Sequence, residues 1–299
     1  MASYWHGGGY GDIVYSIPAY RAGGFDEYVL TPFLHLNQSF FDGSVIVPLL
    51  ERAGIRCRVF AKPGLHVAGR DWVNGDRFRE RFGWAVSRRN GERINIALRH
   101  FLGVGLGSDF SVLPWLNVRP RGVADVVFIR SPRYRPARPQ VDWGTLAKLF
   151  AGRAVFLGFA AEHFAFCQEF GVHVPHLRPA DFLEAGEIMA GSRLVVTNQT
   201  GLGAVAAGLG VSRLLEVCER VSDCRFYWAN EFVSSREWAI KVGGSFCRPG
   251  DEGLLQKLAL GLDEGGLALG VPGEEVLQAR RDESVCNFGV ARQVGGIAV

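Results

Sequence analysis

The sequence is poor in long apolar segments, and none approaches the roughly 18–20 residues that a helix needs to cross a bilayer. The N-terminus also lacks a basic stretch followed by an apolar one, which is the pattern of a secretory signal. We therefore expect a cytoplasmic protein without a transmembrane segment. With 48% apolar and 21% charged residues in 299 positions, the chain is expected to form one large globular domain or two ordinary ones.

Cysteines are present, but their six positions form no C-x-x-C pair. We therefore expect no zinc site and no other resident metal. In a cytoplasmic protein these side chains are expected to be reduced thiols, most of them buried. They are Cys57, Cys167, Cys218, Cys224, Cys247 and Cys286.

The formal net charge is only +3, but the positive residues are unevenly distributed. Arginines cluster in residues 70–99 and again in residues 130–138, which contain Arg130, Arg133, Arg135 and Arg138. The planar arginine fork suits phosphate or carboxylate groups, although a solvated loop with scattered charge would have the same composition. The near-neutral overall charge and the absence of a known reader motif argue against a nucleic-acid-binding module.

Short apolar segments alternate with helical patterns from about residue 125 onward. The expected strands are 126–129, 154–157, 172–174, 193–197 and 214–218, and the expected helices are 142–150, 161–170, 182–190 and a small-residue helix from about 201. This alternation predicts a parallel sheet with right-handed crossovers.

The first 120 residues repeat the pattern less regularly. Strands are expected at 2–6, 27–31, 55–60 and 93–97, a helix at 45–53, and a kink or restart at Pro18 after the apolar segment 13–17. Residues 118–122 have the composition of an inter-domain linker, and a helix is expected near 275–281 before a weakly patterned tail. We therefore predict two domains, residues 1–122 and 123–299.

Two glycine-containing turns are the most informative features of the chain. Residues 197–210 pass from a buried strand through a polar turn into a small-residue helix, and residues 6–12 contain a glycine-rich turn near the N-terminus. A helix N-terminus that follows a strand offers unpaired N–H groups and a positive dipole end, which suit phosphate oxygens. Two such turns predict two ligand-binding halves, although each turn could also be a capped helix start without a ligand.

Three segments carry a resemblance to a known family. They are Gly11-Asp12-Ile13-Val14-Tyr15-Ser16-Ile17-Pro18-Ala19, Leu157-Gly158-Phe159-Ala160-Ala161-Glu162 and Val196-Thr197-Asn198-Gln199-Thr200-Gly201-Leu202. In this order they resemble landmarks of the ADP-heptose:lipopolysaccharide heptosyltransferases, which are glycosyltransferases of family 9. The resemblance covers about residues 6–220. It implies an α/β fold of two Rossmann-like domains facing a cleft, the GT-B type, with the acceptor on the first domain and the nucleotide sugar on the second.

The resemblance also implies roles for individual residues. Asp12 would be the catalytic base, a role that its place at a helix start also allows, although it could instead only stabilise the helix dipole. Glu162 would bind the ribose hydroxyls of the donor, unless it is an ordinary surface charge. A basic residue of the 130–138 cluster would contact phosphate, as would the N–H groups at the helix start. The residues assigned to donor binding are Gly9, Gly11, Arg130, Arg133, Glu162, Asn198, Gln199, Thr200, Gly201 and Leu202.

Two positions depart from the family pattern. Gln199 stands where the family usually has Asp, and Ala204 stands where it usually has His. Both positions border the family's donor-sugar site, so the donor sugar need not be heptose.

The predicted function is that of an inverting, metal-independent glycosyltransferase of the hexosyl- or heptosyltransferase type. Its donor substrate would be a nucleotide-diphosphate sugar, and no separate cofactor is expected. A nucleotide-sugar epimerase or hydrolase, or a non-catalytic nucleotide-sugar-binding protein, remains an alternative. The acceptor stays open between glycan, lipid, protein and modified nucleic acid. A dinucleotide dehydrogenase is disfavoured, because no G-x-G-x-x-G lies in a strand–turn–helix unit followed by the required acidic residue.

Overall fold

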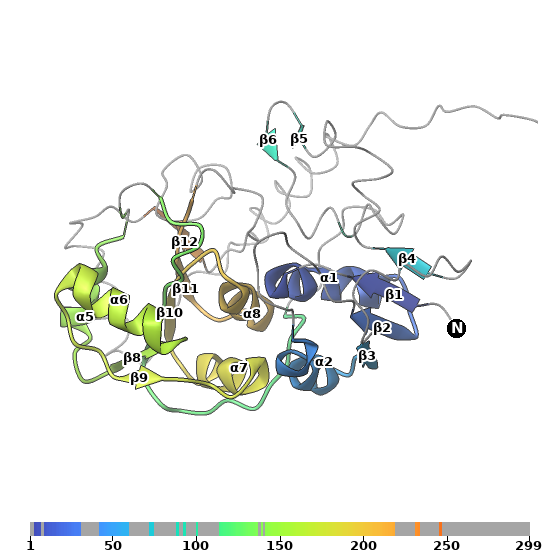
Figure 1. Ribbon diagram of the computed structural model, residues 1–299, viewed down its shortest axis with the longest axis horizontal. Helices are drawn as coiled ribbons and strands as arrows, with labels where there is room; N and C mark the ends of the chain where they lie inside the picture. The colour runs from blue at the N-terminus through green and yellow to red at the C-terminus, as the bar shows by residue number, and fades with distance from the viewer. Residues whose placement is uncertain are drawn as a thin grey trace, which may run out of the picture.

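The computed structural model describes residues 3–6, 9–30, 42–59, 72–74, 88–89, 92–93, 100, 114–136, 139, 141–218, 231–233 and 245–246. Two parallel sheets organise these residues, which confirms the α/β class (Figure 1). Several sequence predictions lie outside the described residues: the helix near 275–281, most of the strand at 93–97, Arg138, Cys224, Cys247 and Cys286. Among the helices described, none combines the length and the hydrophobicity that crossing a bilayer requires.

The first sheet has four parallel strands in the order β3-β2-β1-β4. Its strands are β1 (Ser3–His6), β2 (Glu27–Leu30), β3 (Cys57–Val59) and β4 (Trp72–Asn74). The expected helix at 45–53 is divided into the 3-10 helix η1 (Gly43–Val45) and α2 (Val47–Arg52). Pro48 lies in the first turn of α2, where its missing N–H has no helical partner to lose.

Helix α1 (Tyr10–Ala22) connects β1 to β2, and it runs through Pro18 without a break. The expected restart at Pro18 is therefore wrong, while the kink expected as its alternative stays a prediction. A proline inside a helix costs about 3 kcal/mol. Burial offsets this cost, because every residue from Ile13 to Tyr20 is buried. Tertiary packing has overridden the local preference of the backbone.

The second sheet has seven parallel strands in the order β13-β12-β11-β10-β7-β8-β9. Its strands are β7 (Val126–Ile129), β8 (Ala154–Leu157), β9 (His176–Leu177), β10 (Leu194–Asn198), β11 (Arg213–Glu216), β12 (Glu231–Val233) and β13 (Ser245–Phe246). The helices between them are α5 (Trp143–Leu149), α6 (Ala160–Phe170), α7 (Phe182–Ala190) and α8 (Gly201–Leu209). These helices and most of these strands lie within one or two residues of their predicted bounds.

One strand of this half was misplaced by the sequence pattern. The prediction put it at 172–174, whereas β9 is His176–Leu177. Gly171 ends α6 in the left-handed conformation, and the N–H of Val172 still bonds back to Cys167. The carbonyl of Pro175 accepts the N–H of Phe156, so pairing with β8 begins only there. Residues 172–174 are thus needed to bring the chain from α6 to the sheet edge.

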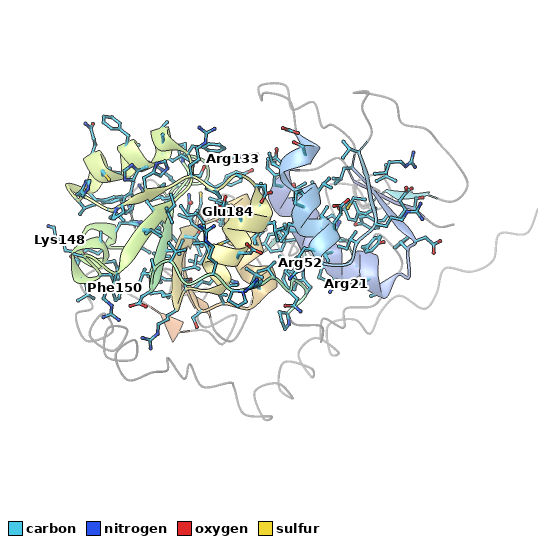
Figure 2. All side chains as sticks on the ribbon, turned by 90° about the horizontal axis from the view of Figure 1, so that it is seen from below. Arg21, Arg52, Arg133, Lys148, Phe150 and Glu184 are labelled. Carbon is cyan, nitrogen blue, oxygen red and sulfur yellow. The ribbon has the colours of Figure 1, made fainter. Side chains whose placement is uncertain are left out.

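Alternate residues of the second sheet enter two different cores. Val126 and Phe128 pack with α5 and α6 on one face, in a cluster that includes Trp143 and Phe166. Val127 on the opposite face belongs to a larger cluster that also contains residues of α7, α8, α1 and the first sheet. Side chains from both halves fill the region where these helices meet (Figure 2). The two sheets are separate, but the larger cluster is a hydrophobic core that both halves share.

The segment 114–121 lies along the helices of the second half. The N–H of Leu116 bonds to the carbonyl of Gly208 in α8, and the N–H of Arg121 bonds to the carbonyl of Glu187 in α7. The side chain of Arg121 also forms an ion pair of 2.8 Å with Glu184. These contacts attach the predicted linker to the second half, while the division at 122/123 itself stays a prediction.

Candidate functional site

Strand order identifies where a ligand site should lie in the second sheet. The chain passes from β7 outward to β8 and β9 and then returns to β10 on the other side of β7. The carboxyl ends of β7 and β10 therefore flank a topological switch point, which is where open α/β sheets bind their ligands. The loop 130–136 follows β7 and the turn 198–200 follows β10. In the first sheet, the same rule points to the end of β1, just before α1.

The turn after β10 forms a well-capped helix start. The hydroxyl of Thr200 accepts the N–H of Gly203 at 2.9 Å, which caps α8. The N–H groups of Gly201 and Leu202 meet no acceptor within the described residues. They are the free donors that the first turn of any helix leaves, and they face outward along its axis. This end of α8 can therefore bind an anion.

The starts of α1 and α8 lie against each other. A Cβ added to Gly11 would come within 3.7 Å of the Cα of Gly201 and 3.9 Å of the Cβ of Ala204. A Cβ on Gly201 would in turn lie 3.2 Å from the Cβ of Tyr10, whose ring packs on Phe182 with centroids 4.8 Å apart. The two glycine turns of the sequence thus meet in space, and the small residues there allow the helices to approach closely.

Asp12 lies in the first turn of α1, next to this meeting point. Its Oδ2 accepts the N–H of Gly9 at 3.1 Å, which caps the helix. Asp12 is therefore held at the start of α1, next to Gly11, which approaches Gly201. A partly exposed carboxylate in this place can accept a proton from a hydroxyl group.

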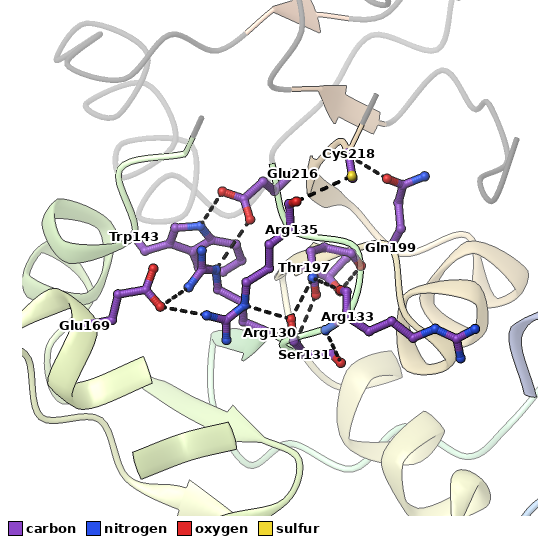
Figure 3. A network of polar contacts seen from close by, with 11 residues as sticks. Arg130, Ser131, Arg133, Arg135, Trp143, Glu169, Thr197, Gln199, Glu216 and Cys218 are labelled. Atoms are coloured by element: carbon purple, nitrogen blue, oxygen red, sulfur yellow. Dashed lines mark hydrogen bonds and ion pairs between the residues drawn. The ribbon is translucent and has the colours of Figure 1, made fainter. Parts of the chain in front are cut away.

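The arginines after β7 divide into buried and exposed groups (Figure 3). The side chain of Arg130 is only 1% exposed, its Nη1 lies 2.6 Å from Glu169, and its Nε lies 3.4 Å from the fully buried Glu216. Glu216 also accepts the indole N–H of Trp143 at 3.0 Å. The Arg130 guanidinium thus has internal partners on two of its nitrogens, and its assignment to donor binding stays a prediction.

Arg135 belongs to the same buried network. Its Nη1 lies 2.8 Å from Glu169, and its Nε donates to the carbonyl of Ser131 at 3.0 Å. Burial lowers the pKa of the Arg135 guanidinium, and the neighbouring positive charge of Arg130 lowers it further. Arg135 therefore stabilises the loop through contacts within the protein, and its side chain does not extend into solvent as an exposed arginine would.

Arg133 is the exposed member of the group. Figure 3 shows its side chain directed away from Arg130 and Arg135. The guanidinium lies over the ring of Tyr134, 4.6 Å from its centroid, and it makes no ion pair within the described residues. Tyr134 has a φ of 57°, an unusual value for a residue other than glycine. The backbone here turns so that Arg133 and Arg135 diverge.

Asn198 and Gln199 hold the site together from inside. The side chain of Asn198 accepts the N–H of Ser131 and donates to the carbonyls of Ser131 and Arg133, each at 3.0 Å. Gln199 accepts the N–H of Cys218 at 2.6 Å. Both side chains are buried. Their observed contacts join the ends of three strands and position the loops, while their predicted contact with the donor stays a prediction.

Glu162 lies one strand beyond Arg133, at the start of α6. Its Oε2 accepts the N–H of Phe159 at 3.1 Å, which caps the helix. Its Oε1 accepts no hydrogen bond within the described residues, so this oxygen is available to a ligand hydroxyl.

The sequence prediction missed the two acidic partners of the arginines. Glu169 and Glu216 neutralise Arg130 and Arg135. Glu216 lies at the end of a buried strand, 213–216, and this position could have indicated a buried ion pair from the sequence. Buried carboxylates are rarely unpaired. The partner of Glu216, 86 residues away, could not be read from the sequence.

The comparisons with known proteins bear on the fold. No protein-family model matches the chain, and no curated protein sequence matches it. The solved structure of E. coli heptosyltransferase WaaC with ADP aligns at 12% identity over 95% of this chain and 100% of that one, with a TM-score of 0.53. WaaC with ADP-2-deoxy-2-fluoro heptose aligns at 13% identity over 78% and 92%, with a TM-score of 0.51. E. coli ADP-heptose lps heptosyltransferase II aligns at 13% identity over 89% and 99%, with a TM-score of 0.50.

These matches cover 78–95% of this chain and 92–100% of the matched chains. The chain therefore has the fold of the bacterial heptosyltransferases, as its three sequence landmarks predicted. At these identities the likeness concerns the fold alone.

Proposed function

We propose that this protein is a glycosyltransferase that transfers a sugar from a nucleotide-diphosphate sugar to an acceptor hydroxyl. The observation that carries the proposal is the contact between the starts of α1 and α8, where Gly11 approaches Gly201. A carboxylate and an anion-binding helix end are thereby brought together from opposite halves. The WaaC structure with ADP supports a nucleotide donor, since it has the same fold.

The donor diphosphate would lie at the start of α8. The free N–H groups of Gly201 and Leu202 and the exposed guanidinium of Arg133 supply hydrogen bonds and positive charge. Such groups stabilise the negative charge that develops on a leaving diphosphate, as a metal ion does in other transferases. Glu162, through its available Oε1, would accept hydrogen bonds from the ribose hydroxyls.

The transfer would invert the anomeric carbon in one displacement. The acceptor oxygen forms a bond to that carbon while the bond to the diphosphate oxygen breaks, and the electron pair leaves with the diphosphate. Asp12 accepts the hydroxyl proton. The base and the leaving group then lie on opposite sides of the sugar, which matches the placement of Asp12 and the α8 start on different halves.

Nucleotide binding tests the proposal. Nucleoside diphosphates at 100-fold their Kd should stabilise the protein by about 2.7 kcal/mol, measured by thermal unfolding. Arg133→Gln should weaken this binding and flatten its dependence on salt, because one cation that faces the phosphates is removed. The matched control is Arg119→Gln, since Arg119 is an exposed arginine outside the site.

Two outcomes would contradict the proposal. If no nucleoside diphosphate or nucleotide sugar stabilises the protein, the donor site is absent. If the protein cleaves a nucleotide sugar and transfers the sugar only to water, whichever class of acceptor is offered, the protein is a hydrolase.

A further inference from the structure

Phe159 is an aromatic residue that the fold leaves in solvent. Its side chain is 67% exposed, whereas Phe128, Phe156 and Phe166 of the same half are fully buried. It is the N-cap residue of α6, directly after β8 and Gly158. It therefore lies at the carboxyl edge of the second sheet, the edge that carries the candidate site.

The turn that holds Phe159 is tightly fixed. Its N–H donates to Oε2 of Glu162, and the ring of His176 contacts the carbonyl of Gly158 through Nε2 at 2.9 Å. Gly158 has a φ of 155°, and a Cβ there would lie 2.9 Å from Oε2 of Glu162. The turn thus requires glycine, and it places an exposed ring beside the carboxylate assigned to the ribose.

We propose that Phe159 is the stacking platform for the nucleobase of the donor, an inference that rests on the proposed function. Because the strands are ordered β10-β7-β8, three parts of the site follow one another along the edge of the sheet. They are the start of α8 after β10, Arg133 after β7, and Glu162 with Phe159 after β8. Adjacent strands lie about 4.8 Å apart, so β8 ends about 10 Å from β10. This is comparable with the separation between the base of a nucleotide and its second phosphate.

The chemistry of the platform fits this position. A diphosphate at the α8 start and a ribose at Glu162 direct the base outward beyond β8, where the exposed ring of Phe159 lies. Stacking on an aromatic side chain tolerates every base, because each base has a π-face. Phe159 therefore contributes affinity for the nucleoside part of the donor and none for pyrophosphate.

The same helix provides a matched control. Phe164 is 63% exposed, nearly as much as Phe159, but it lies five residues further along α6. At 1.5 Å per residue this places it about 7 Å further from the sheet edge. Phe159→Ala and Phe164→Ala thus remove similar amounts of exposed aromatic surface, and only the first lies at the proposed site.

Calorimetric titration of ADP, UDP and inorganic pyrophosphate into the wild type and the variants tests the inference. Phe159→Ala should weaken ADP and UDP binding by about 5- to 150-fold, as expected for loss of a stacked base, and leave pyrophosphate binding unchanged. Phe159→Trp should retain nucleotide affinity, and Phe164→Ala should match the wild type. Thermal unfolding without ligand confirms that each variant is folded.

The outcomes separate this inference from the proposed function. If Phe159→Ala binds ADP as the wild type does, or if Phe164→Ala weakens it equally, the stacking platform is wrong while the donor site stands. If Phe159→Ala loses pyrophosphate as well, the residue acts on the phosphate site and the inference is also wrong. If the wild type binds none of the three ligands, the proposed function fails and the inference with it.

Discussion

Nε of Arg130 lies 3.4 Å from Oε2 of Glu216, and both side chains are buried beneath the loop that follows β7. Arg130 also packs over the rings of Trp143 and Phe170, with its Cζ 5.4 Å and 4.7 Å from their centroids. The pair links β7 to β11 across β10. It thus joins the strands whose ends form the candidate site.

Replacing Arg130 by Met should destabilise the protein by about 3–5 kcal/mol, because the buried carboxylate of Glu216 loses the guanidinium that its Oε2 contacts. Urea unfolding measures this effect. The double variant Arg130→Met with Glu216→Gln should recover much of the loss. If the single and double variants are equally unstable, packing of the arginine stem and not the ion pair accounts for the effect.

Asn198→Ala should destabilise the loop 130–136 by removing hydrogen bonds within the protein. Three hydrogen bonds to backbone groups of Ser131 and Arg133 are lost, which is expected to cost roughly 1–3 kcal/mol in unfolding free energy. Because Arg133 is then less well positioned, nucleoside-diphosphate affinity should fall as well. A stability loss with unchanged affinity and unchanged salt dependence would show that Asn198 does not position Arg133.

Asp12→Asn should lower turnover by roughly 10²–10⁴-fold and leave donor binding intact. Asparagine keeps an oxygen that can accept the N–H of Gly9, so the cap of α1 is preserved while the base is removed. Transfer assays and nucleotide titrations on the same preparation measure the two effects. Near-normal turnover would leave Asp12 as a helix cap only.

Glu184 makes the stability of the fold depend on pH. Its carboxylate accepts the N–H of Ala180 at 2.7 Å and pairs with Arg121, and these contacts hold its pKa below the ordinary value. Because the folded pKa is lower than the unfolded one, this stabilisation is present above the unfolded pKa and is lost as pH falls through the folded pKa.

The wild type should therefore be more stable than Glu184→Gln near neutral pH, and this difference should shrink as pH falls below about 4.3. Urea unfolding over a pH series measures it, and Arg121→Gln should reproduce part of the effect. A difference that is independent of pH would show that the charge of Glu184 contributes nothing.

The second half was predictable because a parallel sheet buried on both faces requires continuous apolar strands, such as Val126–Ile129. The start of α8 was predictable from a local pattern, since Thr200 and Gly201 follow a strand directly. Interactions between distant residues were not predictable. Neither the burial of Arg130 nor the bonds of Asn198 to a loop 65 residues away leaves a local pattern. The helical conformation at Pro18 was not predictable either, because it depends on tertiary packing.

The contact between α1 and α8 also determines how the two halves can move. Gly11, Gly201 and Ala204 are small residues that let the two helix starts approach closely. The shared core opposes a wide hinge rotation, because that would expose apolar side chains of both halves to water. Sliding of α1 along α8 keeps those side chains covered. We therefore expect any adjustment between donor side and acceptor side to be a small shear motion.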